Sequence, residues 1–288
     1  MINKLCIIGV GLIGGSLARA LKKVGAVAEV VGAGRDVAHL EKAKALGVID
    51  SFETDISLAV KGCDMVVVAV PLCAMTSVFE KIASSYHDDM VVTDVGSAKA
   101  SVVSAATAAF KTLPGGFVPG HPIAGTEKSG VEASFAELYE KRRVIITPLD
   151  SSSTQAKEKV RKMWELCGAE VVETTVAHHD DVLAATSHLP HVLAYSLVDT
   201  LARMDDKQEI FDFAAGGFRD FTRIASSNPQ MWHDICLSNS DALVKMIDRF
   251  TDGLQTLSKA IKNKDGAYLK ETFTRAKIAR DEFCEDKK

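Results

Sequence analysis

The hydrophobic residues in the first half of the chain form short continuous runs, separated by stretches with helical periodicity. The runs at residues 5–8, 29–31 and 65–70 predict buried strands, because a strand covered on both faces needs no polar alternation. Residues 12–24 and 37–46 predict helices, since each stretch is stopped by a glycine. Repeated strand–helix–strand units favour an α/β fold with a doubly wound parallel sheet.

The strand signal continues past the middle of the chain. Residues 90–93, 143–147 and 169–172 resemble further strands, and a helix is predicted at 154–166 before the last of them. We therefore expect the same sheet to extend through this region.

The pattern changes near residue 177, where strand-like runs stop. Helical periodicity with polar faces follows at residues 191–203, 230–254 and 265–283. This change predicts an α/β domain over residues 1–176 and an all-helical domain over residues 177–288.

Composition narrows the classes of partner. The chain has 288 residues, 47% of them hydrophobic, and a formal net charge of −4, which argues against a nucleic-acid partner. It has no polybasic run and no apolar stretch long enough to cross a bilayer, so no membrane association is expected. The six cysteines are scattered, and we expect reduced thiols and a cytoplasmic protein.

A glycine-rich turn directly follows the first strand and opens the first helix. Its spacing is Gly9-x-Gly11-x-x-Gly14. In this context the glycines permit a tight turn, a close backbone approach to a pyrophosphate, and close packing of helix on strand. The first domain is therefore predicted to be of the Rossmann type. We expect dinucleotide contacts from Gly9, Gly11, Leu12, Ile13 and Gly14 and, after the strand at 65–70, from Val70 and Pro71.

The end of the second strand bears on the choice of dinucleotide. A carboxylate there binds the ribose hydroxyls of NAD, whereas an arginine pairs with the 2′-phosphate of NADP. The sequence offers both Arg35 and Asp36, while Gly34 occupies the usual acidic position. NAD is therefore the expected cofactor with NADP possible, and simple solvated turn charges are the alternative for both side chains.

Four segments carry candidate chemistry beyond the ends of the strands. They span residues 94–99, 120–130, 187–191 and 221–232. Their strings DxGSxK, GHPIAGTEKSG, SHLPH and TRIASSNPxMW, together with the opening GxGLxGGS, resemble the prephenate dehydrogenase family, arogenate and cyclohexadienyl dehydrogenases included. The resemblance spans nearly the whole chain and implies the dehydrogenase alone, without a fused mutase or regulatory domain.

The resemblance implies oxidative decarboxylation of prephenate or arogenate in tyrosine biosynthesis, with hydride passed to NAD(P). The histidine of the GHP string, His121, would accept the ring hydroxyl proton, a task suited to a neutral imidazole. Ser97 would hydrogen-bond that hydroxyl or His121. Lys99, in the same turn, would add positive potential at the substrate.

The substrate also carries carboxylates, which need cationic or donor partners. By resemblance, Arg223 would bind one of them, since a planar guanidinium fits a carboxylate bidentately. His191 and His179 match substrate-contacting histidines of the helical region. Glu127 is the remaining substrate-site candidate, although an acidic loop residue is commonly just solvated.

Each residue has a structural alternative. His121 could be a loop histidine bonded to the backbone, Ser97 could cap a helix, and Arg223 could pair with Asp220 on the surface. His188 and His191 are spaced as metal ligands can be, but no third ligand follows at convincing spacing, so no metal is expected.

Two other functions compete with this interpretation. One is another β-hydroxyacid or imine dehydrogenase, and the other is a non-catalytic NAD(P)-binding regulator. The sequence does not decide whether the substrate is prephenate or arogenate. It also leaves open whether tyrosine inhibits the enzyme. An apolar stripe at helical spacing that includes Trp232, Leu243 and Phe250 suggests, with the resemblance, a homodimer built by the helical domain.

Overall fold

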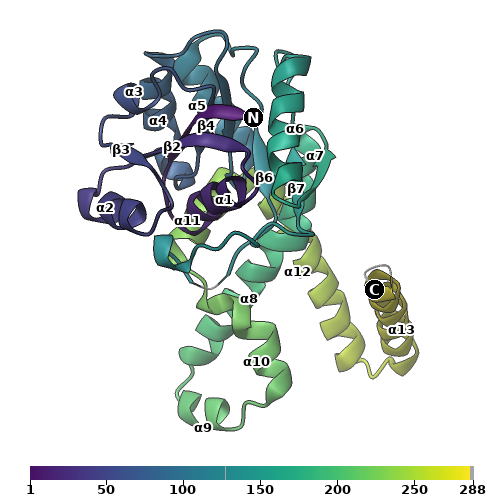
Figure 1. Cartoon of the computed structure of the whole chain (residues 1–288). Helices are drawn as coiled ribbons and strands as arrows, with labels where there is room; N and C mark the ends of the chain where they lie inside the picture. The colour runs from purple at the N-terminus through teal and green to yellow at the C-terminus, as the bar shows by residue number, and fades with distance from the viewer. Residues whose placement is uncertain (127, 286–288) are drawn as a thin grey trace. The chain divides into compact units, whose positions relative to one another are not determined.

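The computed structural model describes residues 1–126 and 128–285, and its first half is organised around a five-stranded sheet (Figure 1). All of its strands run parallel, in the order β3-β2-β1-β4-β5. The strands are β1 (Ile2–Ile8), β2 (Val27–Ala33), β3 (Ser51–Glu53), β4 (Met65–Val68) and β5 (Val91–Asp94). The predicted parallel sheet is confirmed, and the three-residue β3 is an addition to it.

Helices cover both faces of this sheet, which confirms the doubly wound architecture. Alternate residues of β4 point to opposite sides, so Val67 joins one apolar cluster and Val66 the other. One cluster is completed by α1 (Leu12–Lys23), α2 (Val37–Ala45) and α6 (Thr154–Leu166), the other by α3 (Ile56–Ala59), α4 (Met75–Ala83) and α5 (Lys99–Phe110). Continuous apolar runs in the sequence reflect this two-sided burial.

The later strands form a second sheet, so the expectation of one continuing sheet is wrong. Its order is β6-β7-β8, with β6 (Gly120–Pro122) antiparallel to β7 (Arg143–Ile146) and β7 parallel to β8 (Glu170–Glu173). Beyond β5, the described residues continue the main ladder only as an isolated bridge between Val92 and Phe117. A pairing of one residue cannot extend a sheet, and the chain turns away to pair β6 with β7.

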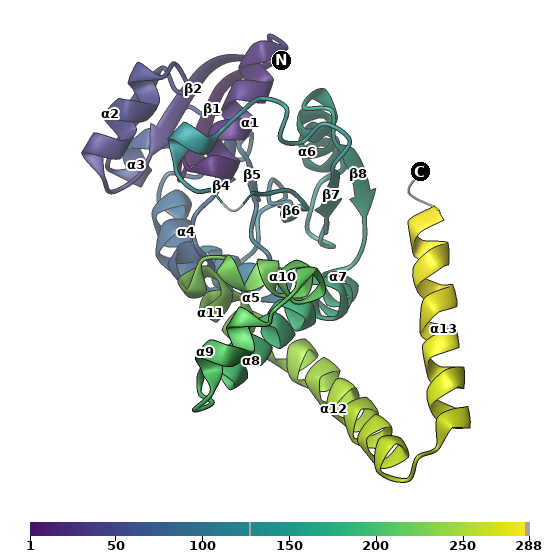
Figure 2. The ribbon, with the colours of Figure 1, turned by 90° about the horizontal axis from the view of Figure 1, so that it is seen from below.

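A long helical segment follows the second sheet (Figure 2). It begins with α7 (Val176–Leu183), continues through a π-helical turn (Ala184–His188) and ends with α8 (Leu189–Ala202). Thr175 caps α7, its side chain accepting from the amide of His178. Further on come α9 (Lys207–Asp212), α10 (Gly216–Thr222), a 3₁₀ turn (Arg223–Ser226) and α11 (Pro229–Ser238).

The single helix predicted over residues 230–254 is two helices. α11 ends at Ser238, Asn239 leaves the helical conformation, and α12 (Ser240–Lys262) begins anew. Asn239 is buried and donates its side-chain amide to the carbonyl of Asp180. The break between α11 and α12 coincides with this tertiary hydrogen bond, which the hydrophobic periodicity of the sequence does not reveal.

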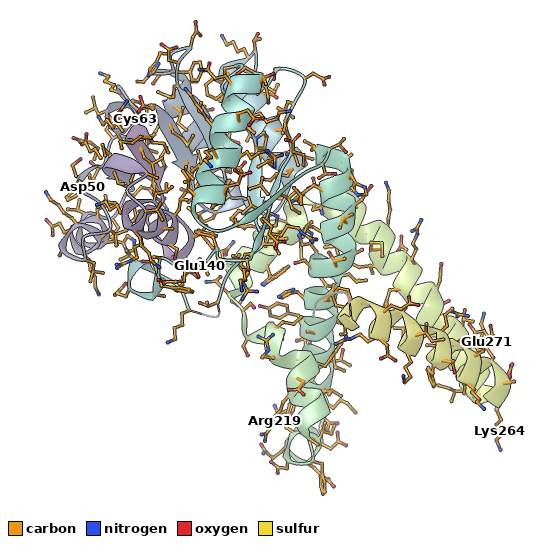
Figure 3. All side chains as sticks on the ribbon, turned by 45° about the vertical axis from the view of Figure 1, so that its right-hand side comes forward. Asp50, Cys63, Glu140, Arg219, Lys264 and Glu271 are labelled. Atoms are coloured by element: carbon orange, nitrogen blue, oxygen red, sulfur yellow. The ribbon has the colours of Figure 1, made fainter. Side chains whose placement is uncertain are left out.

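By compactness the chain divides into two units, Met1–Ser240 and Asp241–Lys288. The second unit contains most of α12 and all of α13 (Gly266–Glu285), joined at Lys264, which has a φ of 55° (Figure 3). Large apolar side chains are exposed on both helices, including Leu254, Ile261 and Phe273. Within the described residues, no helix is both long enough and apolar enough to span a bilayer.

Candidate active site

The turn after β1 contains two glycines, Gly9 and Gly14, at which any side chain would clash with the backbone. Gly9 has a φ of +96°, and a Cβ there would lie 2.3 Å from the carbonyl oxygen of Ala69. A Cβ on Gly14 would lie 2.3 Å from the carbonyl oxygen of Gly9, so the start of α1 sits directly on the turn. A Cβ on Gly11 would meet nothing within 4 Å. Gly11 therefore faces open space, as a backbone that receives a pyrophosphate must.

A first cavity begins at this turn and runs to the end of β2. Gly9, Gly11, Val70 and Pro71 line one part of it, and Gly34, Arg35 and Asp36 line the other. The residues predicted for the ribose end therefore line the same cavity as the glycine turn. Asp36 has a second task, since its carboxylate caps α2 by accepting from the amide of His39 at 3.1 Å.

A second cavity of about 620 Å³ shares Gly11 and Ala69 with the first. Leu12, Ile13 and Gly14 line its near end. Ser97, His121, His191 and Arg223 also line it. Four of the predicted substrate-site residues, drawn from four separate segments, therefore meet in one cavity next to the glycine turn.

His121 lies on the strand β6, opposite Ile145, and not in a loop. Its ring is 8% exposed, and its Nδ1 lies 2.9 Å from Nε2 of His179. Burial lowers the pKa of His121 well below 6.5, and the nearby His179 and Lys99 lower it further. The imidazole is therefore neutral at physiological pH and able to accept a proton.

Ser97 stands in the turn between β5 and α5. The alternative that it caps this helix is wrong, because the cap position is Ala98 and Asp180 binds the first amides instead. One oxygen of the Asp180 carboxylate accepts from Lys99 and the other from Ala100, each at 2.8 Å. Ser97 itself lines the second cavity.

Lys99 is fully buried and does not line the cavity. Its ammonium forms an ion pair with Asp94 and donates to the carbonyl oxygen of Gly120 at 2.6 Å. Burial lowers the pKa of Lys99, although the Asp94 carboxylate opposes that effect. The ammonium thus ties the Ser97 turn to β6, one residue before His121.

Another predicted substrate contact, His179, is also absent from the described cavity lining. His179 is 1% exposed and lies behind His121. Glu127 lies outside the described residues.

His191 presents its ring to the cavity from α8. Its Nδ1 lies 2.9 Å from the carbonyl oxygen of Ser187, and its ring stacks on Trp232 with centroids 3.6 Å apart. Trp232 lines the same cavity, a role that the sequence interpretation missed in assigning it to the dimer stripe. The string TRIASSNPxMW contained the signal, because Trp232 lies within one motif with Arg223.

His188 is a second residue whose place the sequence left undefined. Asn239 contacts its Nδ1 at 3.1 Å, and the ring hydrogen-bonds the Ser97 backbone. Burial lowers its pKa to about 4. The ring therefore links the buried Asn239 to the turn that bears Ser97, and His188 also lines the second cavity. Among the described residues no cluster of three or more histidine, cysteine or acidic side chains is arranged to hold a metal ion.

Comparison with known proteins shows the family to which the chain belongs. Residues 17–173 match the family model of the prephenate dehydrogenase nucleotide-binding domain, and residues 175–275 match that of the prephenate dehydrogenase dimerization domain. The chain belongs to the prephenate dehydrogenase family. Similar family members include a cyclohexadienyl dehydrogenase of Zymomonas mobilis, 39% identical over 96% of this chain and 94% of that protein. A prephenate dehydrogenase of Bacillus subtilis is 37% identical over 98% of this chain and 76% of its own length.

Solved structures of prephenate dehydrogenase family members share the fold. The enzyme of Aquifex aeolicus, in complex with hydroxyphenyl propionate and NAD⁺, superposes with a TM-score of 0.91 at 36% identity, covering 98% of this chain and 99% of that one. An arogenate dehydrogenase of Synechocystis gives a TM-score of 0.84 at 27% identity, covering 97% and 99%. The Rossmann-type first domain and the helical part that follows it are thus confirmed.

Proposed function

We propose that the protein oxidises and decarboxylates prephenate, or its amino counterpart arogenate, and passes a hydride to NAD⁺ in tyrosine biosynthesis. The observation that carries this proposal is a buried, neutral His121 in a cavity that continues into the glycine turn. A neutral imidazole there can take a hydroxyl proton beside a bound dinucleotide.

The proposed chemistry makes His121 a base that is restored in each turnover. As hydride leaves the carbinol carbon of the ring, the hydroxyl proton passes to the imidazole and a ring ketone forms. The carboxylate then leaves as CO₂, and the electron pair of its carbon–carbon bond enters the ring and reaches the oxygen. The oxygen takes the proton back from the imidazolium, leaving a phenol and a neutral His121. Ser97 would orient the hydroxyl or the imidazole.

We propose that Arg223 binds a substrate carboxylate from the far side of the cavity. A guanidinium can offer two parallel donors to one carboxylate, which fixes orientation as well as charge. His191, whose ring stacks on Trp232, lines the same cavity and would contact the ligand from α8. His179 and Lys99 act through other residues, because neither lines the cavity.

The residues around the first cavity fit a dinucleotide. NAD⁺ supplies the hydride acceptor when bound. Gly9, Gly11 and Gly14 would let the backbone approach its pyrophosphate, with the start of α1 adding its positive dipole end. Val70 and Pro71 would cover the other wall. Arg35 and Asp36 would meet the adenosine ribose. Because the Asp36 carboxylate already caps α2 and Arg35 could pair with a 2′-phosphate, NADP is possible as well as NAD.

We propose a homodimer and a cytoplasmic location. The matched dimerization domain and the exposed apolar side chains of α12 and α13 support the dimer. A domain boundary at residue 176 stays a prediction, in keeping with the change of family model between residues 173 and 175.

The function is tested by mixing the purified protein with prephenate or arogenate and with NAD⁺ or NADP⁺, and following absorbance of the reduced dinucleotide. We expect turnover with at least one of the four pairings and identify the product by chromatography. Binding of a dinucleotide without consumption of either substrate would support a non-catalytic regulator instead. Turnover of an unrelated hydroxy acid alone would support another dehydrogenase class.

A further inference from the structure

A chain of buried side-chain hydrogen bonds lies behind His121, on the side away from the cavity. Nδ1 of His121 is 2.9 Å from Nε2 of His179, and Nδ1 of His179 is 2.7 Å from an oxygen of Asp180. All three residues are at most 8% exposed. Only His121 of the three lines the cavity, so the other two reach a substrate only through it.

The chemistry of the groups fixes the direction of this chain. Burial acts to raise the pKa of Asp180, but hydrogen bonds from His179 and from the amides of Lys99 and Ala100 hold it below its usual value. An ionised carboxylate only accepts, so Nδ1 of His179 carries a proton and, in a neutral ring, Nε2 does not. Nδ1 of His121 must then donate to it. The lone pair of His121 is left on Nε2, the nitrogen still available to a ligand.

We propose that His179 and Asp180 form a positioning pair, which holds His121 in the tautomer whose Nε2 accepts the substrate proton and stabilises the imidazolium that then forms. This proposal rests on the role of His121 in the proposed function. The negative charge of Asp180 sits one ring away from His121, a distance at which it offsets the new positive charge without taking the proton itself.

The same carboxylate also holds the neighbouring turn. Asp180 belongs to α7, which lies beside α5 (Figure 2), and its oxygens cap the first amides of α5 after Ser97. One side chain therefore fixes both the base and the turn that bears Ser97. A residue serving only the packing of α7 would need no such set of acceptors.

Among the described residues, Lys128, His191 and Arg223 line the same cavity as His121, and four further titratable groups lie around its ring. His179 lies behind the ring, Lys99 and His188 lie close enough to lower its pKa, and Asp180 lies beyond His179. Lys99 forms its ion pair with Asp94. Asp180 is therefore the anion best placed to stabilise a protonated His121.

Substitution of His179 tests the pair. His179→Phe keeps a ring but removes the acceptor, whereas the amide oxygen of His179→Gln can still accept from His121. We expect kcat of the phenylalanine variant to fall about 100-fold, with KM and the Kd of NAD⁺ within about threefold of wild type, and glutamine to recover at least about tenfold of the loss. His178→Phe, on the exposed side of α7, is the matched control and should behave as wild type.

Several outcomes would overturn the proposal that His179 and Asp180 position His121. They are a kcat of folded His179→Phe within about threefold of wild type, no recovery with glutamine, or a loss confined to KM, which would make His179 a substrate contact. If His179→Phe does not fold, Asp180→Asn carries the test. Its loss of charge should lower kcat about tenfold and move the acidic limb of the kcat profile to lower pH, and an unchanged profile would refute the pair.

A measurement independent of turnover separates the pair from the proposed function. In a proton–nitrogen correlation spectrum of protein carrying isotope-labelled histidine, the signal lost in His121→Asn belongs to His121. We expect it to show a proton on Nδ1 and none on Nε2. The opposite tautomer in wild-type protein would refute the pair even if the enzyme turns over, whereas absent turnover with the expected tautomer would refute only the proposed function.

Discussion

At the scale of single residues, the cavity separates the side chains that meet the substrate from those that hold them. Ser97 and Lys99 are two positions apart, yet one lines the cavity and the other is fully buried. Lys99 begins a helix, which turns its side chain toward Asp94 and β6. The sequence assigns both residues to the turn at 94–99. The direction of each side chain in that turn, however, depends on its tertiary partners.

Kinetics should distinguish the proposed roles of His121 and Arg223. His121→Asn removes the base, so kcat should fall by about 10²- to 10⁴-fold with little change in KM. Arg223→Ala removes a carboxylate partner and should chiefly raise KM, roughly 10- to 100-fold. Steady-state assays with saturating NAD⁺ measure both, and the reversed pattern would mean that the roles are misassigned.

The pH dependence follows from the burial of His121. The base must be neutral to work, and its pKa in the free enzyme lies below 6.5. The kcat/KM profile should therefore stay level as the pH falls through 6.5 and decline only at lower pH, once the imidazole is protonated. An acidic limb centred at or above pH 6.5 would contradict the assignment of His121 as the base.

At the scale of elements, two substitutions in the glycine turn should cause different defects, one in folding stability and one in dinucleotide binding. Gly14→Ala places a Cβ 2.3 Å from a backbone oxygen and should cost about 1–3 kcal/mol of folding stability or more. Gly11→Ala meets no atom within 4 Å, so the fold should keep its Tm while the Kd of NAD⁺ rises about tenfold or more.

Thermal unfolding and a dinucleotide titration of both glycine variants test these two expectations. Each variant serves as the control for the other. Wild-type affinity in Gly11→Ala would show that the pyrophosphate does not approach this backbone.

The elements were predictable where their signal was long or strongly periodic. The buried strands of the main sheet and the glycine turn needed only local pattern. The strand β6 has three residues, too few for any periodicity, and it is defined by its pairing with β7. The break at Asn239 likewise depends on a bond to Asp180, 59 positions away. Motif strings identified His121 and Arg223, but no pattern indicated that His179 lies behind His121.

At the scale of the whole molecule, self-association is the property most open to test. The apolar positions 243, 247, 250, 254, 257 and 261 of α12 repeat with the three–four spacing of a helix-pairing stripe. Leu254 and Ile261 on this stripe are exposed in the single chain. A surface of this kind is expected to pair in a dimer.

We therefore expect light scattering to give twice the 30.9 kDa mass of the chain. The double variant Leu254→Glu with Ile261→Glu should shift the protein toward monomer, because charge on the stripe would have to be desolvated on pairing. Lys259→Glu adds an acidic residue off the stripe and should leave the dimer intact. A monomeric wild-type protein at micromolar concentration would contradict the dimer.

The Asp180 carboxylate accepts both from His179 and from the first amides of α5. These two contacts limit how the two halves of this chain can be exchanged with those of a relative. His121 and α5 belong to the segment matched by the nucleotide-binding family model, whereas His179 and Asp180 belong to the segment matched by the dimerization model. A chimera joined at residue 174 would inherit its base from one parent and the support of that base from the other. Its halves would interchange only between parents that keep this histidine–aspartate pair in register with the first turn of α5.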